Sequence, residues 1–118
     1  MGNLKSYHSK CRKILCQTAK RRQTITYGDL AGALDLASPR QQWSTVLNPI
    51  YKDEMHNTGR DLTLVAVYAS GPAKGLSRYF SNGRAPQTAM LDPRNLQQVK
   101  TYKQELENVF DTYAKLPC

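Results

Sequence analysis

The segment of residues 26–80 constrains the fold of this chain more than any other part. It contains two short runs that begin with helix-capping residues, and then two strand-like runs separated by a loop rich in Gly and Pro. Two helices followed by a β-hairpin are the parts of a winged helix-turn-helix. With one helix before this segment and one after it, we predict an α+β fold with the order α-α-α-β-β-α. The length of 118 residues is typical of one domain, which we assign to residues 1–118.

Capping residues indicate where the two central helices begin. Thr26 precedes a short run of small and apolar residues, and with Asp29 three positions later it forms a capping box. Ser38 is a good N-cap for the next helix, with Pro39 in the first helical position. Pro49 removes a hydrogen bond from that helix, so we expect a kink or a restart there. The buried face of this second helix is predicted to consist of Trp43, Val46, Leu47, Ile50 and Tyr51.

Apolar spacing predicts one further helix at each end of the chain. Residues 4–20 place apolar side chains at intervals of three and four, which is typical of an amphipathic helix. The last helix is long and is predicted to start at Asp92 as the cap and Pro93 in the first position. Its apolar face leaves two interpretations open, because it can close the core of the domain or pair with a second copy as a homodimer.

The predicted hairpin lies between residues 62 and 80. Residues 62–68 are β-branched, apolar and aromatic, which favours a strand. Residues 76–80 form a second, shorter strand, and residues 72–75 are the loop between them. In a winged helix this hairpin is the wing.

The charge of the chain favours a polyanionic partner. There are 17 Lys and Arg against 9 Asp and Glu, a formal net charge of +8. Residues 1–22 carry seven basic side chains and residues 70–91 carry three, and neither segment has an acidic one. Such a concentration of positive charge attracts nucleic acid, because binding releases its condensed counterions. The alternative is a solvated basic surface that only aids solubility.

The side chains at the start of the second central helix suit the reading of DNA bases. Arg bonds guanine bidentately, Gln does so with adenine, and Ser or Thr bonds bases or phosphates. The alternative is that Gln41 only caps the helix and Arg40 is solvated. Tyr27 either contacts a phosphate or packs where the first of the two helices begins. The predicted DNA-binding residues are Tyr27, Arg40, Gln41, Gln42, Ser44, Thr45 and Asn48, with Lys74, Arg78 and Arg84 on or beside the wing.

Two short motifs resemble those of a known family. Residues 26–31, Thr-Tyr-Gly-Asp-Leu-Ala, are similar to the opening of the C-terminal domain of alkylguanine-DNA alkyltransferases, and residues 46–50 resemble the Asn-Pro stretch that ends that family's recognition helix. The resemblance covers roughly a fifth of the chain. It implies a DNA-binding winged helix, and it places Arg40 near the helix-borne arginine that fills the space left by a flipped-out nucleotide.

The catalytic motif of that family is absent. The chain lacks the Pro-Cys-His-Arg sequence, and no cysteine lies between Cys16 and Cys118. Alkyl transfer is therefore not supported, and the resemblance points instead to alkyltransferase-like proteins, which bind lesions without repairing them. No nucleophile has a base and an orienting acid in an evident pattern. We therefore expect no catalysis and no cofactor.

The three cysteines, Cys11, Cys16 and Cys118, give no sign of a metal site or a disulfide framework. Cys11 and Cys16 lie five apart on a predicted helix and so project in different directions. With no CxxC pair and two isolated histidines, we expect no zinc site and no disulfide, and interpret both cysteines as apolar filler or reduced thiols. No apolar run reaches the roughly 18 residues of a membrane span, and the first residues lack a signal peptide pattern. The expected location is the cytoplasm.

Three hypotheses for function follow. The first is a non-catalytic protein that binds duplex DNA, as a regulator or as a binder of lesions or structures. The second is RNA binding, with the basic first helix along the backbone and Tyr68, Tyr79 and Phe80 stacked on bases. The third is a protein-interaction or small-ligand module in which Trp43, Tyr51 and Tyr27 line a pocket at the helix junction.

Overall fold

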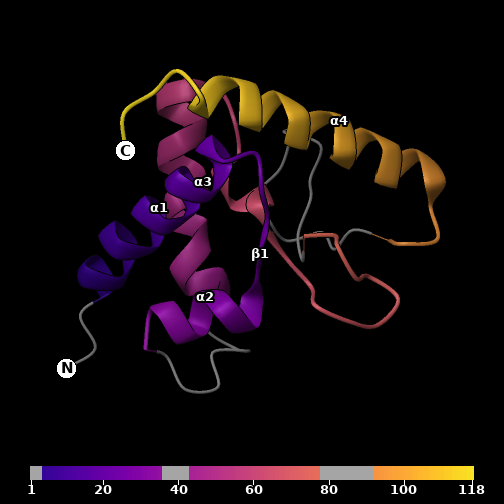
Figure 1. Ribbon diagram of the computed structural model, residues 1–118, viewed down its shortest axis with the longest axis horizontal. Coiled ribbons are helices and arrows are strands. Elements are labelled where there is room, and N and C mark those ends of the chain that lie inside the picture. The colour runs from indigo at the N-terminus through magenta and orange to yellow at the C-terminus, as the bar shows by residue number, and fades with distance from the viewer. Residues whose placement is uncertain (1–3, 36–42, 78–91) are drawn as a thin grey trace.

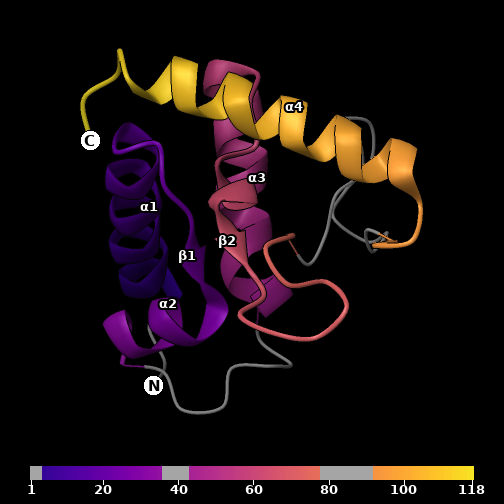
Figure 2. The same cartoon turned by 45° about the vertical axis from the view of Figure 1, so that its right-hand side comes forward.

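The computed structural model describes residues 4–35, 43–77 and 92–118. Within them the order of elements is α1 (Leu4–Lys20), β1 (Ile25–Thr26), α2 (Tyr27–Ala33), α3 (Trp43–Thr58), the 3-10 helix η2 (Leu62–Val65), β2 (Ala66–Val67) and α4 (Leu96–Tyr113). Helix α4 crosses the ends of α1 and α3, and α2 lies at the opposite end of the molecule (Figures 1 and 2). The described residues therefore form an α-rich α+β structure.

The helices predicted from capping and periodicity are present. Helix α1 spans the predicted residues 4–20. The Thr26 hydroxyl accepts a hydrogen bond from the backbone N–H of Asp29 at 3.1 Å, so Thr26 is the N-cap of α2 as predicted. The predicted start of the next helix at Ser38 and Pro39 lies outside the described residues. Helix α3 continues through Pro49 to Thr58 without the expected restart.

The predicted hairpin is not confirmed. Leu62–Val65 is a 3-10 helix, so the first strand does not begin at residue 62, and the strand that follows has only two residues, Ala66–Val67. This strand pairs in parallel with β1, where Ile25 lies opposite Ala66. Across the predicted loop, the Tyr68 N–H donates to the Leu76 carbonyl at 3.0 Å. Residues 76 and 77 are not in a strand, and residues 78–80 lie outside the described part of the chain. The winged-helix arrangement of strands is therefore not present in the described residues.

Local hydrogen bonds explain why residues 62–65 turn instead of extending. The Asp61 carboxylate accepts the backbone N–H of Thr63 at 3.0 Å, which caps the 3-10 helix. The Tyr102 hydroxyl of α4 donates to the carbonyl of Leu64 at 2.6 Å. A carbonyl bonded to a buried side chain does not need a partner strand, and side-chain bonds of this kind compete with sheet formation.

Helix α4 closes the core of the same molecule. It begins at Leu96, with Asn95 as its N-cap, so the predicted start at Asp92 and Pro93 is wrong by about one turn. The Asp92 carboxylate instead accepts the backbone N–H of Arg94 in the preceding turn. The apolar face of α4 is buried in the core through Tyr102, Val109, Phe110 and Tyr113. Of the two interpretations of this face, the structure shows the first.

The second prediction that the structure contradicts is the absence of a disulfide. Cys16 on α1 forms a disulfide with Cys118, 102 residues later in the chain. The expectation of no disulfide was wrong because it compared only neighbouring cysteines, and this bond depends on how α4 returns over α1. Cys11 is free and fully buried, as expected of apolar filler.

Candidate nucleic-acid interface

Helix α3 carries part of the predicted site. The inner face is buried through Trp43, Val46, Leu47 and Ile50. Ser44 and Thr45 lie on the first turn of the helix and Asn48 one turn later. Because α3 does not restart at Pro49, the exposed Lys52 follows Asn48 by four residues on the same face. Sequence patterns alone did not identify Lys52, since the expected break at Pro49 left it in a polar end segment.

The other predicted contacts are partly outside the described chain. Lys74 is exposed in a turn whose ends are joined by hydrogen bonds from Gly75 N–H to the Tyr68 carbonyl at 2.9 Å and from Tyr68 N–H to the Leu76 carbonyl at 3.0 Å. The remaining predicted contacts lie outside the described residues: Arg40, Gln41, Gln42, Arg78 and Arg84. The structure therefore places Lys74 on a surface turn, and the contacts of those five side chains stay predictions.

Of the two roles considered for Tyr27, phosphate contact and packing at the start of a helix, the structure shows packing. It is 9% exposed, and its ring lies 5.4 Å from that of Trp43 and 5.3 Å from that of Tyr68, measured between centroids. Its hydroxyl is 3.3 Å from Ser77 Oγ. Tyr27 therefore joins the starts of α2 and α3 to the chain after β2, and its buried hydroxyl is poorly placed for a phosphate.

The pocket expected at this junction is filled by its own aromatic side chains. Trp43 is 4% exposed and Tyr51 is 9% exposed, like Tyr27. An open hollow of about 690 Å³ lies instead along α4, beside Leu96, Lys100 and Lys103. The aromatic residues thus pack in the core at the helix junction, and a ligand site there stays a prediction.

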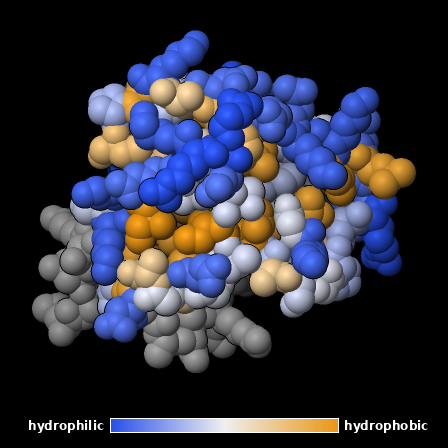
Figure 3. Space-filling view, in the orientation of Figure 1, coloured by the Kyte–Doolittle hydropathy of each residue, from blue (hydrophilic) through white to orange (hydrophobic). Residues whose placement is uncertain are grey.

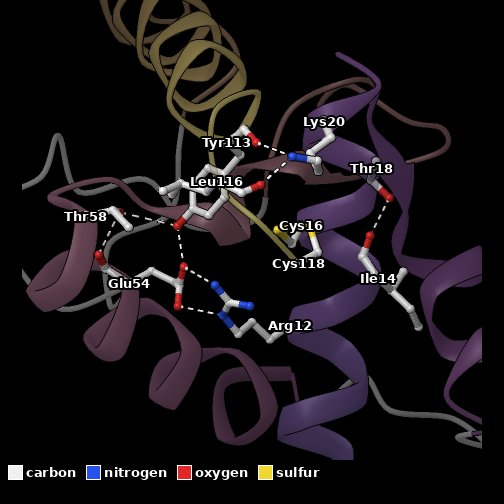
Figure 4. The surroundings of a disulfide bond; sticks show 10 residues. All are labelled: Arg12, Ile14, Cys16, Thr18, Lys20, Glu54, Thr58, Tyr113, Leu116 and Cys118. Carbon is white, nitrogen blue, oxygen red and sulfur yellow. Dashed lines mark hydrogen bonds and ion pairs between the residues drawn. A yellow bond between two sulfur atoms is a disulfide. The ribbon is translucent and has the colours of Figure 1, made fainter.

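The acidic side chain of Glu54 is paired with a cation inside the fold. The buried Glu54 of α3 receives the Arg12 guanidinium of α1, with 2.9 Å between Nε and Oε2, and the hydroxyl of Tyr113 (Figure 4). The carboxylate raises the pKa of Arg12. Burial, and then the hydrogen bond to Glu54, raise the pKa of Tyr113. This cluster holds α1, α3 and α4 together, and it removes Arg12 from the set of free cations.

The acidic side chains of α4 form ion pairs with Arg22, which follows α1, and with Arg60. Arg22 contacts Glu107 at 2.7 Å and Asp111 at 2.8 Å, and its guanidinium carbon lies 5.5 Å from the centroid of the Phe110 ring. Arg60 pairs with Glu105 at 2.9 Å. The acidic residues of α4 are therefore bound to cations from other elements, and the lysines of α4 are left without them.

The surface left by this pairing is positive. Figure 3 shows hydrophilic side chains gathered over the upper part of one face, along α4. Of the seven basic residues in positions 1–22, Arg12 and Arg22 are in ion pairs, and the Lys20 ammonium donates to the carbonyls of Tyr113 and Leu116. Besides Lys20, the exposed cations with no ion pair among the described residues are Lys10, Lys13, Arg21, Lys52, Lys74, Lys100, Lys103 and Lys115. Since the charges within each ion pair cancel, these unpaired cations carry much of the net charge of +8.

Asn48 has an unusual environment for a predicted contact. The residue is half-buried, and its Oδ1 atom is buried with no hydrogen-bond partner among the described residues. Buried polar atoms are nearly always bonded in proteins. The Oδ1 atom of Asn48 therefore has an acceptor capacity that no described residue uses.

The described residues offer little for a metal site or for chemistry at the free thiol of Cys11. In residues 4–35, 43–77 and 92–118, no group of three or more His, Cys, Asp or Glu side chains is arranged to hold a metal ion. Burial raises the pKa of the Cys11 thiol to about 12, so this thiol stays protonated at neutral pH. In the same part of the chain, no helix is both long enough and apolar enough to cross a bilayer.

The comparisons with known proteins found no match. No family model, no curated protein and no solved structure is significantly similar to this chain. The resemblance of residues 26–50 to alkyltransferases stays a prediction.

Proposed function

We propose that this protein is a non-catalytic nucleic-acid-binding protein whose partner is duplex DNA, bound along the outer face of α3. The observation that carries the proposal is the sorting of charge by the fold. The carboxylates of Glu54, Glu105, Glu107 and Asp111 are paired with arginines of other elements, Glu54 inside the fold and the others at or near its surface. Most exposed lysines have no ion pair among the described residues. A surface with an excess of unpaired cations binds polyanions through counterion release.

The outer face of α3 adds the means to position a duplex. Lys52 lies one turn beyond Asn48, so an exposed cation and a half-buried amide lie on one side of a 16-residue helix. Lysine contacts phosphate, and the Asn amide bonds adenine bidentately. Arg40, Gln41 and Gln42 precede this helix in the chain and are proposed to contact bases, with Arg78 and Arg84 on the backbone. Lesion recognition of the alkyltransferase-like kind belongs to the same proposal.

A salt-titrated binding assay on labelled duplex, mismatched and single-stranded oligonucleotides tests the proposal. Replacing Lys52 by Gln removes one phosphate contact, so we expect weaker binding to every duplex and a salt slope reduced by about 0.9. Lys100→Gln is the matched control, because Lys100 is also an exposed helical lysine but lies on α4. Equal effects of the two substitutions would show that α3 is not the binding face.

Substitutions at the predicted base contacts separate specific from general binding. Arg40→Ala and Gln42→Ala are expected to relax sequence or lesion preference, and Arg78→Ala to weaken all duplexes alike. If all three leave duplex affinity unchanged in a folded protein, the assigned face is wrong. Tighter binding of single-stranded RNA than of duplex DNA at the same salt would favour the RNA hypothesis instead.

The proposed location is the cytoplasm. In that compartment a disulfide is exposed to cellular thiols and is usually transient. The Cys16–Cys118 bond would then be in exchange with those thiols.

A further inference from the structure

A disulfide joins the segment after α4 to α1. Cys16 lies on the buried side of α1 with none of its surface exposed, whereas Cys118 is exposed (Figure 4). An attacking thiol can therefore reach the side of Cys118 before that of Cys16. The two residues differ in exposure, and a difference in access to the two sulfurs is the condition for directed thiol–disulfide exchange.

Besides the disulfide, a few hydrogen bonds hold residues 114–118 in place. The backbone N–H groups of residues 114, 115 and 116 donate to the carbonyls of Phe110, Thr112 and Tyr113 at 3.0–3.3 Å. The Lys20 ammonium donates to the carbonyl of Tyr113 at 3.2 Å and to that of Leu116. The Leu116 side chain is half-buried against the core. Residues 114, 115, 117 and 118 are exposed. Few buried contacts and exposed backbone are the marks of a segment that opens locally.

Helix α4 itself is attached independently of the disulfide. Tyr102 and Val109 are fully buried in the core, and Arg22 binds Glu107 and Asp111 of α4. The Tyr113 hydroxyl is bonded to the buried Glu54. Loss of the disulfide therefore leaves α4 docked and frees only the segment after it.

We propose that Cys16–Cys118 is a thiol-exchange site that latches residues 114–118 to α1. The thiolate of a dithiol attacks Cys118 Sγ, the bond between Cys118 and Cys16 breaks, and Cys16 leaves as a thiolate that takes up a proton. The second thiol of the reductant then attacks the mixed disulfide and releases the Cys118 thiol. The two cysteines are reduced and the dithiol is oxidised to its disulfide, a transfer of two electrons.

Lys20 attaches the same segment to α1 a second time. It lies four residues after Cys16 on α1. Its ammonium donates to the Leu116 carbonyl, two residues before Cys118 in the chain. The exchange therefore takes place at a segment that one cation still holds near α1 after the disulfide has opened.

Thiol counting on the folded chain of 118 residues tests the latch. The oxidised protein is treated with excess dithiothreitol, pulsed with N-ethylmaleimide and examined by mass spectrometry and circular dichroism. We expect two adducts, on Cys16 and Cys118, with helical content unchanged and Cys11 modified at least about 100-fold more slowly, because Cys11 reacts only after larger opening. Carboxypeptidase is expected to remove residues 116–118 only after reduction.

Two variants complete the test. Cys118→Ser is expected to fold, to be digested by carboxypeptidase without reductant, and to have a melting temperature that dithiothreitol does not change. Cys11→Ser is the matched control, because it removes a cysteine and keeps the latch, so its response to reductant is expected to match that of the natural chain. Three adducts with loss of helical content, or no adduct in the native state, would contradict the proposed latch. Failure of Cys118→Ser to fold would contradict it as well.

Discussion

At the residue scale, Glu54 is the acidic side chain on which most of the helix packing depends. It is 2% exposed and is bonded to Arg12 of α1 and Tyr113 of α4. The Thr58 hydroxyl, one turn later on α3, donates to the Glu54 carbonyl at 2.8 Å and is 3.3 Å from the Tyr113 hydroxyl. A buried carboxylate is tolerated because a cation and hydroxyl groups surround it.

Replacing Glu54 by Gln is expected to lower the free energy of unfolding by about 3 kcal/mol, because Arg12 then loses the charge that compensates it in a partly buried site. Urea unfolding followed by circular dichroism measures the change. Asp53→Asn is the matched control on the same helix. The Asp53 side chain is 59% exposed and lies 3.3 Å from His8, so the loss is expected to stay within about 1 kcal/mol. Similar losses in both variants would contradict the role given to Glu54.

The buried thiol of Cys11 leads to a second prediction at this scale, which concerns the stability of the protein at alkaline pH. Its pKa is raised by burial from 9.0 to about 12 in the folded protein. The stabilisation is therefore complete below pH 9 and is lost as the pH rises toward 12, since the unfolded thiol ionises first. Between pH 9 and pH 10 the natural chain is expected to lose about 1 kcal/mol relative to Cys11→Ala.

Stopped-flow unfolding and refolding rates give this difference before disulfide exchange intervenes. Below pH 8 the two proteins are expected to have the same pH dependence. The tyrosines do not disturb the comparison, because burial raises the pKa of Tyr102 and of Tyr113 from an ordinary value of 10.0 in both proteins. A parallel pH dependence of both proteins up to pH 10 would show that Cys11 ionises freely in the folded state.

At the element scale, local signals predicted the helices and failed for the strands. The bounds of α1 and the cap of α2 follow from spacing and from a side chain three residues away. Residues 62–65 have strand-like composition, but their conformation depends on Asp61 and on Tyr102, a side chain 38 residues from Leu64. The amino-acid composition of residues 62–65 gives no information about that contact with Tyr102.

The cap of α2 is open to a direct test. Thr26→Ala removes the acceptor for the Asp29 N–H, so we expect a loss of about 1 kcal/mol in the free energy of unfolding. Thr26→Ser keeps the hydroxyl and is expected to recover most of that loss. Urea unfolding of the three proteins provides the comparison, and an equal loss in Thr26→Ser would assign the effect to the methyl group instead of the cap.

At the scale of the whole molecule, the fold decides which cations are free. In the sequence the basic residues of positions 1–22 form one set, but Arg12, Lys20 and Arg22 bind groups on α3, on α4 and after α4. Their partners lie 42 to 96 residues away. The excess of positive charge could therefore be predicted from composition, whereas its division into structural and free cations could not.

This division predicts opposite effects of neutralising the two kinds of cation. Lys10 and Lys13 are exposed on α1 and have no ion pair among the described residues. The double variant Lys10→Gln/Lys13→Gln is expected to keep the stability of the natural chain and to reduce the salt slope of duplex binding by up to about 1.8, at about 0.9 for each phosphate that is no longer neutralised. Arg12→Gln is the contrasting variant on the same helix. It leaves Glu54 buried without its cation, so we expect a loss of about 3 kcal/mol in stability with no change in the salt slope of the folded protein. Urea unfolding measures the stability of each variant, and salt-titrated binding measures its salt slope. A reduced slope in Arg12→Gln, or an unchanged slope in the double variant, would show that the ion pairs do not sort the charge in this way.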